Sequence, residues 1–162
     1  MVTENPQSSE SLLLGREGNI RGVTIEQKVA GLIGNLPYVS NVVQTEKWTT
    51  EDKDMIDLIV QLDGGDGLTV GVVFVQIKAS TKGVEHFEER LAVKLKQDKG
   101  NGGPADRKLW MLDNRRIILN GDLEMSKSRK HRRHFTDEEI VSNFQAQLLE
   151  IDAHEKAKLT GE

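Results

Sequence analysis

Hydrophobic residues recur along the chain with two periods, one of three to four residues and one of two residues. The longer period predicts three helices. The first has capping-box spacing at Thr24 and ends at Gly34, the second begins at Ser80 or Thr81, and the third has capping-box spacing at Thr136. The positions expected to be buried are Ile25, Val29, Leu32 and Ile33 in the first helix, Val84, Phe87, Leu91 and Leu95 in the second, and Ile140, Phe144, Leu148 and Ile151 in the third.

The shorter period and the β-branched residues predict strands. The run VGVVFVQIK, which ends at Lys78, is apolar on nearly every residue, and this favours a central strand with both faces covered. A glycine-rich turn precedes it, and a flexible loop is expected over residues 99–106. The predicted strands are residues 39–45, 56–62, 70–78, 109–112 and 117–119.

This order of elements predicts an α/β fold with a mixed central sheet, flanking helices and an added C-terminal helix. With 162 residues, one folded domain is expected. We divide the chain into a flexible leader (1–19), a core (20–125), a basic linker (126–134), and a C-terminal helix that packs on the core and ends in a tail (135–162). No apolar run approaches the roughly 20 residues that span a bilayer, and no export signal or cysteine is present, so a cytoplasmic protein is expected.

Charge is distributed unevenly along the chain. The total is −4, from 22 Lys and Arg against 26 Asp and Glu, which by itself argues against a polyanion partner. However, residues 1–68 carry 5 basic and 11 acidic side chains, residues 76–134 carry 15 and 8, and residues 135–162 carry 2 and 7. The middle of the chain is therefore a candidate surface for an anion, with clustering on solvated loops as the alternative.

Polar residues occupy three places where a core does not need them: Glu26 in the first helix, Asp57 in the second predicted strand, and the pair Gln76 and Lys78 in the third. Side chains alternate across a strand, so Gln76 and Lys78 share one face. If Leu62 and Thr69 close the hairpin turn, Asp57 lies opposite about Phe74 and diagonal to Gln76, on that same face. The four side chains are therefore expected to converge.

The residues DMIDLIV around Asp57 and VQIKAS around Gln76 and Lys78, with Glu26 on the preceding helix, resemble the PD-(D/E)xK nuclease superfamily over about residues 23–119. The resemblance implies a restriction-endonuclease-like αβββαβ core. It also implies that Asp57 is the metal-binding acid, that Gln76 occupies the usual glutamate position, that Lys78 is the catalytic lysine and that Glu26 is the auxiliary helix acid.

Hydrolysis of a phosphodiester needs a hard cation that neutralises developing charge and makes water nucleophilic. The resemblance therefore implies a Mg²⁺ or Mn²⁺ ion held by Asp57, the Gln76 amide oxygen, the Ile77 carbonyl and Glu26, with Lys78 near the attacking water or the phosphate. The hypothesis is a Mg²⁺-dependent endodeoxyribonuclease. The departure from the pattern is Gln76, because a neutral amide in place of a carboxylate weakens metal affinity.

Two alternatives to the nuclease stay open. In one, the same fold is catalytically inactive and binds nucleic acid or a protein partner; in the other, the protein is an oligomeric scaffold. Basic residues that could contact phosphates are Lys82, Lys127, Arg129, Lys130, Arg132 and Arg133. DNA is the expected partner. A homodimer, the form of the substrate and any sequence specificity are left open by the sequence.

Overall fold

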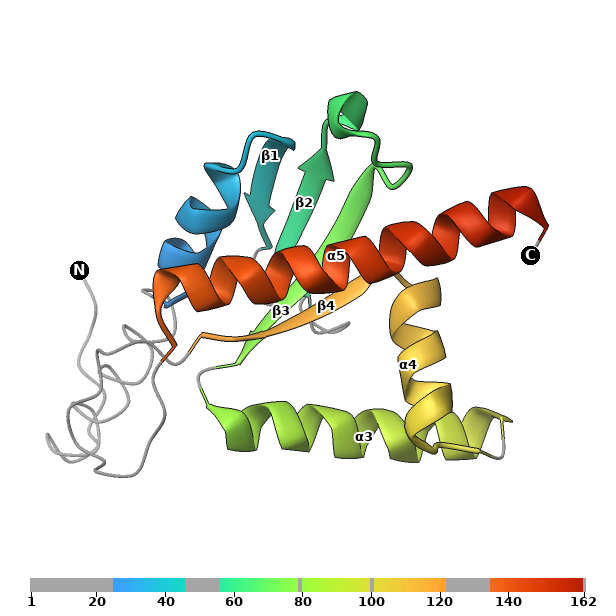
Figure 1. Ribbon diagram of the computed structural model, residues 1–162. Coiled ribbons are helices and arrows are strands. Elements are labelled where there is room, and N and C mark those ends of the chain that lie inside the picture. The colour runs from blue at the N-terminus through green and yellow to red at the C-terminus, as the bar shows by residue number, and fades with distance from the viewer. Residues whose placement is uncertain (1–24, 46–55, 79, 100, 122–134, 162) are drawn as a thin grey trace, which may run out of the picture.

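The computed structural model describes residues 25–45, 56–78, 80–99, 101–121 and 135–161, which form a four-stranded sheet with helices packed against it (Figure 1). Residues 25–34 are helical, and this helix precedes the sheet. The labelled elements are, in chain order, β1 (Val39–Gln44), β2 (Leu58–Leu62), the 3-10 turn η1 (Gly64–Asp66), β3 (Val72–Lys78), α3 (Thr81–Lys99), α4 (Pro104–Asp113), β4 (Arg116–Asn120) and α5 (Asp137–Thr160).

The sheet is mixed and has the strand order β1-β2-β3-β4. The first two pairs are antiparallel, whereas β3 and β4 are parallel. A parallel pair requires a crossover between its strands, and α3 and α4 provide it. The predicted α/β fold, with a mixed central sheet, flanking helices and an added C-terminal helix, is therefore confirmed.

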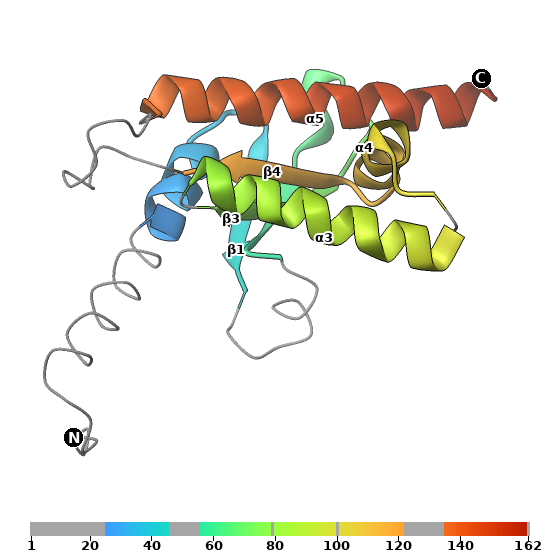
Figure 2. The same cartoon turned by 90° about the horizontal axis from the view of Figure 1, so that it is seen from below.

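Alternate residues of β3 divide between the two faces of the sheet. Val73, Val75 and Ile77 are buried and belong to the larger core, which joins the sheet to the helix of residues 25–34 and to α5. The residues between them point to the opposite face, toward the side where α3 packs with Trp110, Met111 and Ile118 in a second, smaller core. Figure 2 shows α5 and α3 on different sides of β4, which lies between them.

The segment between α3 and β4 differs from the prediction. We expected a loop over residues 99–106 and a strand over 109–112, but the chain forms α4 there, and the predicted strand is wrong. Pro104 at the start of α4 and Asp106 in its first turn both favour a helix N-terminus. A short apolar run has no period of its own, so only its packing against both cores fixes it as helix.

The β2–β3 hairpin has a register two residues away from the expected one. Leu62 donates its N–H to the carbonyl of Gly71, not to Thr69, and Leu58 pairs with Val75. The predicted pairing of Asp57 with Phe74 is therefore wrong. A shift of two residues leaves each side chain on its original face, so the alternation that the sequence indicates survives the error.

The C-terminal helix begins and packs as the sequence predicts. Thr136 Oγ1 accepts the N–H of Glu139 at 3.1 Å, and Glu139 Oε1 accepts the N–H of Thr136 at 3.3 Å, which is the predicted capping box. Farther along, the Gln147 amide donates to the Ile118 carbonyl at 2.9 Å and accepts the Ile118 N–H at 3.1 Å. Gln147 thus pairs the outer edge of β4 as another strand would. No helix in the described part of the chain has the length and apolar character to cross a bilayer.

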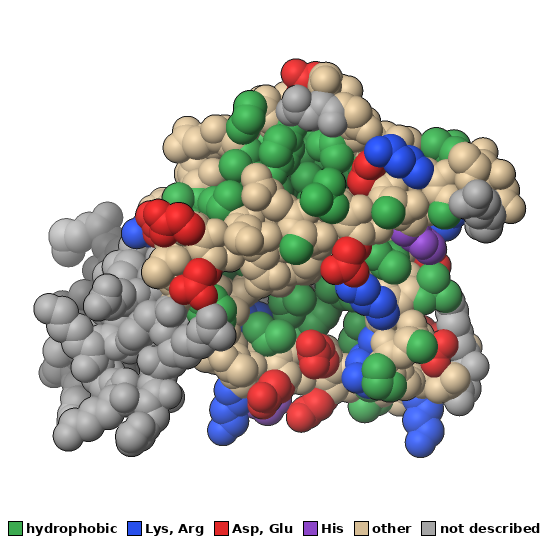
Figure 3. Space-filling model, viewed as in Figure 1, with side chains coloured by type: hydrophobic (Ala, Val, Ile, Leu, Met, Phe, Trp, Pro, Cys, Tyr) green, Lys and Arg blue, Asp and Glu red, His purple; other side chains and the backbone are tan. Residues whose placement is uncertain are grey.

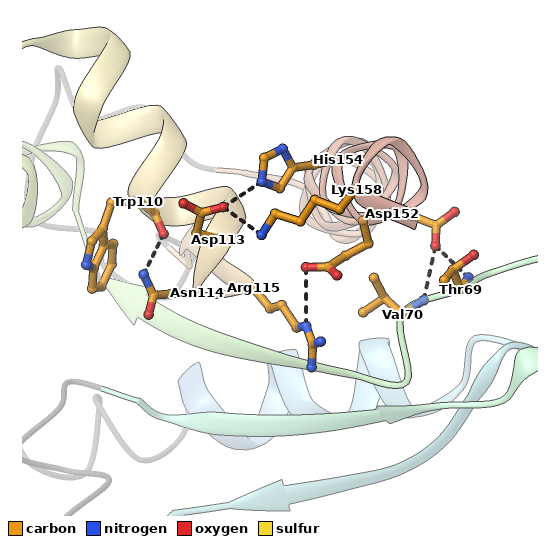
Figure 4. A network of polar contacts seen from close by, with 10 residues as sticks. Thr69, Val70, Trp110, Asp113, Asn114, Arg115, Asp152, His154 and Lys158 are labelled. Carbon is orange, nitrogen blue, oxygen red and sulfur yellow. Dashed lines mark hydrogen bonds and ion pairs between the residues drawn. The ribbon is translucent and has the colours of Figure 1, made fainter. Parts of the chain in front are cut away.

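Asp152 fastens α5 to the segment that leads into β3 (Figure 4). This residue is only 3% exposed, and its carboxylate accepts the backbone N–H groups of Thr69 at 2.6 Å and Val70 at 3.1 Å, while Lys156 lies 2.7 Å away. Burial would raise the pKa of Asp152, but the hydrogen bonds from Lys156 and the two amides outweigh it and lower the pKa. The charged form is therefore the one that the fold stabilises.

We expect Asp152→Ala to lower the free energy of unfolding by about 2 kcal/mol at pH 7, because the part-buried Thr69 N–H and the buried Val70 N–H lose their acceptor. Since the folded pKa is lowered, the carboxylate contributes stability above its unfolded pKa of about 3.9, and this contribution is lost as the pH falls through the folded value. Urea unfolding of both proteins at pH 7, 5 and 3 measures this. The difference should shrink at pH 3, and exposed Asp98→Ala should change little; a constant difference would contradict the assignment.

A second set of contacts joins the end of α4 to the last turns of α5. Asp113 Oδ1 lies 2.7 Å from His154 Nε2 and 2.8 Å from Lys158 Nζ. Hydrogen bonds from Lys158 and His154 lower the pKa of Asp113. Figure 4 shows both partners reaching from α5 toward α4. Contacts with α5, which the sequence predicts, therefore hold α4, which the sequence does not predict.

Candidate functional site

Asp57 lies at the point where the β2–β3 ladder ends. Leu58 pairs with Val75, and Asp57 donates its own N–H to the carbonyl of that same Val75 at 2.9 Å. Two residues of one strand thus oppose one residue of the other, as in a β-bulge. The Asp57 carboxylate accepts the N–H of Ile77 at 2.7 Å. It therefore replaces the main-chain carbonyl that would accept this N–H if the β2–β3 ladder continued. The carboxylate is held at this edge of β3 by the backbone.

The carbonyl of Ile77 faces the same edge. In an extended strand the N–H and the C=O of one residue point to the same side, and the Ile77 N–H points to the Asp57 carboxylate. A carboxylate and a main-chain carbonyl are therefore neighbours at the end of the β2–β3 ladder. Both are hard oxygen donors of the kind that Mg²⁺ and Mn²⁺ prefer.

Gln76 and Lys78 point to the side of the sheet where α3 begins. Gln76 is a buried polar residue, 5% exposed. The Lys78 side chain lies against Gly83 in the first turn of α3, where an added Cβ would come within 3.3 Å of the lysine Cβ. Gln76 pairs with Ile118 and Lys78 with Asn120 in β4, so Gln76 and Lys78 share one face, as predicted. The position of Asp57 differs from the prediction. Its carboxylate accepts a hydrogen bond from the backbone N–H of Ile77, between Gln76 and Lys78.

The charge of Lys78 is influenced by two groups of opposite sign. Burial lowers the pKa of Lys78, the positive charge of Arg90 lowers it further, and the negative charge of Asp57 raises it, with a net lowering. Arg90 follows Gly83 by seven residues, which is close to two helical turns, and so lies along the same side of α3. Our sequence reasoning did not select Arg90. The helical spacing from Gly83 was the signal that could have identified it.

The helix that carries Glu26 is fixed next to the end of β3. Gly121 is buried, and a Cβ there would come within 2.6 Å of Ile25 Cγ2 and 2.9 Å of Ile77 Cγ2, so only glycine lets the two residues approach this closely. The N–H of Gly121 also donates to the Lys78 carbonyl at 2.7 Å. Ile25 therefore lies beside Ile77, the residue between Gln76 and Lys78. Glu26 follows Ile25 directly in the sequence and is half-buried.

The donor set at this end of β3 is compatible with one divalent cation. Asp57 and the Ile77 carbonyl supply oxygen at the same edge, and Mg²⁺ commonly binds to one or two carboxylates while it retains waters. No group of three or more His, Asp and Glu side chains gathers among the described residues. The predicted set has only two carboxylates, and its other donors are an amide and a main-chain carbonyl.

Basic residues lie on the α3 side of the sheet, the side to which Gln76 and Lys78 point. Lys94 and Arg116 lie on the Trp110 ring, at 5.7 and 5.3 Å from its centre. Lys82 is exposed near the start of α3. The other predicted phosphate contacts, Lys127, Arg129, Lys130, Arg132 and Arg133, lie outside the described residues.

A cavity of about 310 Å³ opens between α3, α4, β4 and α5. Figure 3 shows a hollow below α5 with hydrophobic side chains inside and charged side chains around it. Ile118 lines it and pairs with Gln76 in the neighbouring strand, so the cavity adjoins the candidate site. Its lining residues are Phe87, Glu88, Leu91, Pro104, Arg107, Lys108, Met111, Leu112, Arg116, Ile118, Gln147, Glu150 and Ile151.

The fold and the site together define an α/β protein with a mixed sheet and a polar cluster where the β2–β3 ladder ends. Comparisons of the chain with protein-family models, with curated proteins and with solved structures give no match. Any functional conclusion therefore depends on the residues of this cluster and on their surroundings.

Proposed function

We propose that this protein is a metal-dependent endodeoxyribonuclease. The observation that carries the proposal is the position of Asp57: its carboxylate bonds to the Ile77 N–H and so lies beside the Ile77 carbonyl, with Gln76 and Lys78 on either side of Ile77. A helix acid, a strand acid and a Gln-x-Lys triplet in this order support the resemblance to PD-(D/E)xK nucleases.

Asp57 and the Ile77 carbonyl are the groups that would hold a Mg²⁺ or Mn²⁺ ion, and Gln76 and Glu26 are its further proposed ligands. Such an ion lowers the pKa of a bound water and neutralises charge on a phosphate. Lys78 places a compact positive charge next to this position, and its stem is fixed against Gly83. Arg90 extends the positive charge along α3, where a second phosphate of a DNA strand could bind.

One observation favours a second candidate, a module with this fold that binds DNA or a protein without cutting it. Gln76 is neutral and only 5% exposed, so it brings no charge to the site. The Asp57 carboxylate also has a structural hydrogen bond to Ile77, which an inactive descendant would retain. The binding module requires the basic residues but not the chemistry of Asp57 and Lys78.

The test is cleavage of supercoiled plasmid, branched DNA and single-stranded DNA with Mg²⁺ or Mn²⁺. We expect Lys78→Ala to lower the rate about a hundredfold, because a positive charge near the transition state is lost. The exposed Lys96→Ala should leave the rate unchanged. If wild type cleaves none of these substrates, or if Lys78→Ala cleaves as fast as wild type, the nuclease proposal is wrong.

The pH profile provides a second readout of Lys78. Because burial and Arg90 lower its pKa, the lysine loses its charge below the 10.5 of an ordinary lysine. The cleavage rate should therefore start to fall at a lower pH than a free lysine would allow, and Lys78→Arg should move this alkaline fall upward.

A further inference from the structure

An apolar strip crosses the sheet next to the candidate site. In the strand register Val43 pairs with Ile59, Ile59 with Phe74, and Phe74 with Arg116, so these four residues form one row on one face. It is the face to which Gln76 and Lys78 point, since even-numbered residues of β3 share it. Val43 is 41% exposed, and Ile59 and Phe74 are half-buried.

The strip belongs to neither hydrophobic core of the described residues. The larger core takes the opposite side of each strand, with Val42, Leu58, Val60, Val73 and Val75 among its members. The smaller core is built on α3, α4 and Ile118. Neither of these clusters includes Val43, Ile59 or Phe74. Three neighbouring apolar side chains outside both cores form an apolar patch, a feature that binding surfaces share.

The strip is continuous with the candidate site and meets a cation, Arg116, at one end. Phe74 precedes Gln76 by two residues, which corresponds to about 7 Å along β3, and Lys78 lies another two residues on. The Arg116 guanidinium lies on Trp110 together with the Lys94 ammonium. Phe74 thus has one cation, Arg116, beside it in the neighbouring strand and another, Lys78, farther along β3. This arrangement is complementary to a DNA strand, in which flat bases alternate with phosphates.

We propose that the strip of Val43, Ile59 and Phe74 binds unpaired nucleotides of a DNA strand, with a base stacked on Phe74 and the neighbouring phosphates directed to Lys78 and Arg116. This inference rests on the proposed function and specifies its substrate as DNA with a single-stranded segment. A duplex encloses the faces of its bases, so only an unpaired base can stack on an aromatic ring of the sheet face.

The test measures binding of a fluorescent single-stranded oligonucleotide and of a blunt duplex by anisotropy, in EDTA so that no cleavage occurs. We expect Phe74→Leu to weaken single-strand binding by about fivefold to a hundredfold with little effect on the duplex, because stacking is lost while apolar volume remains. Phe74→Tyr should retain the wild-type affinity. Val72→Ala, on the same strand and face, is the matched control and should retain it as well.

The result that overturns the inference is equal single-strand affinity of wild type and Phe74→Leu, or a wild type that binds only the duplex. If Phe74→Leu does not fold, as judged by circular dichroism, Val43→Ser on the exposed edge strand takes its place, with a smaller expected loss. Phe74-dependent binding without metal-dependent cleavage would retain the strip and refute the nuclease. If Phe74→Leu cleaves a blunt duplex as fast as wild type does, the nuclease proposal is supported and the binding role of the strip is refuted.

Discussion

Asp57→Asn should reduce metal-dependent DNA cleavage about a thousandfold. The variant removes the carboxylate that bonds to the Ile77 N–H, and a metal ion contributes several kcal/mol of transition-state stabilisation, at about 1.4 kcal/mol for each factor of ten. Asparagine keeps an oxygen that can accept the Ile77 N–H, so the fold should be retained. The loss should therefore appear in the cleavage rate, with little change in thermal unfolding.

Two further variants make this prediction specific. Asp98→Asn removes an exposed carboxylate of α3 and should cleave like wild type. Gln76→Glu adds a carboxylate to the site, so Mn²⁺ should bind more tightly and should raise the melting temperature more than in wild type. Titration calorimetry with Mn²⁺ measures the affinity. Retention of full activity by Asp57→Asn would exclude the proposed site, and so would a Mn²⁺ affinity that neither Asp57→Asn nor Gln76→Glu changes.

Phe144→Ala should lower the free energy of unfolding by about 3 to 5 kcal/mol. Phe144 is fully buried where α5 covers the sheet, and its truncation leaves a cavity that the surrounding strands fill only in part. Since small domains have total stabilities of about 5 to 15 kcal/mol, this single change approaches the limit of folding. Urea unfolding followed by circular dichroism provides the measurement.

Leu149 is the matched control for Phe144 because it lies on the same helix and is 61% exposed. Leu149→Ala should change stability by no more than about 0.5 kcal/mol. Equal losses in the two variants would mean that α5 does not pack on the sheet through its predicted stripe. A large loss in Phe144→Ala alone would confirm that the C-terminal helix is part of the folded core.

The total charge of the chain is a poor guide to its surface. The value of −4 results from acidic ends and a basic middle. The structure places Arg90, Lys94 and Arg116 from that middle segment on the α3 side of the sheet, the side to which Lys78 also points. This grouping comes from α3 and β4 together, and neither segment alone shows it.

By itself, the sequence determined the elements whose local signals agree. The capping box at Thr136 and the stripe through Phe144 specified α5, and the alternation along β3 specified which residues share a face, because both patterns depend only on local geometry. The site residues Asp57, Gln76 and Lys78 were selected for the same reason: they interrupt these patterns. Whether they perform the proposed chemistry stays a prediction.

Only the tertiary structure decided the features that depend on contacts between distant segments. Residues 109–112 became part of a helix because α4 packs between two cores, although a short apolar run has no preferred period. The hairpin register lies two residues from the predicted one because the turn closes at Gly71, whose carbonyl accepts the Leu62 N–H. Arg90 came to lie near Lys78 through helix placement, and Val43, Ile59 and Phe74 came to form one row through strand pairing, which no local pattern encodes.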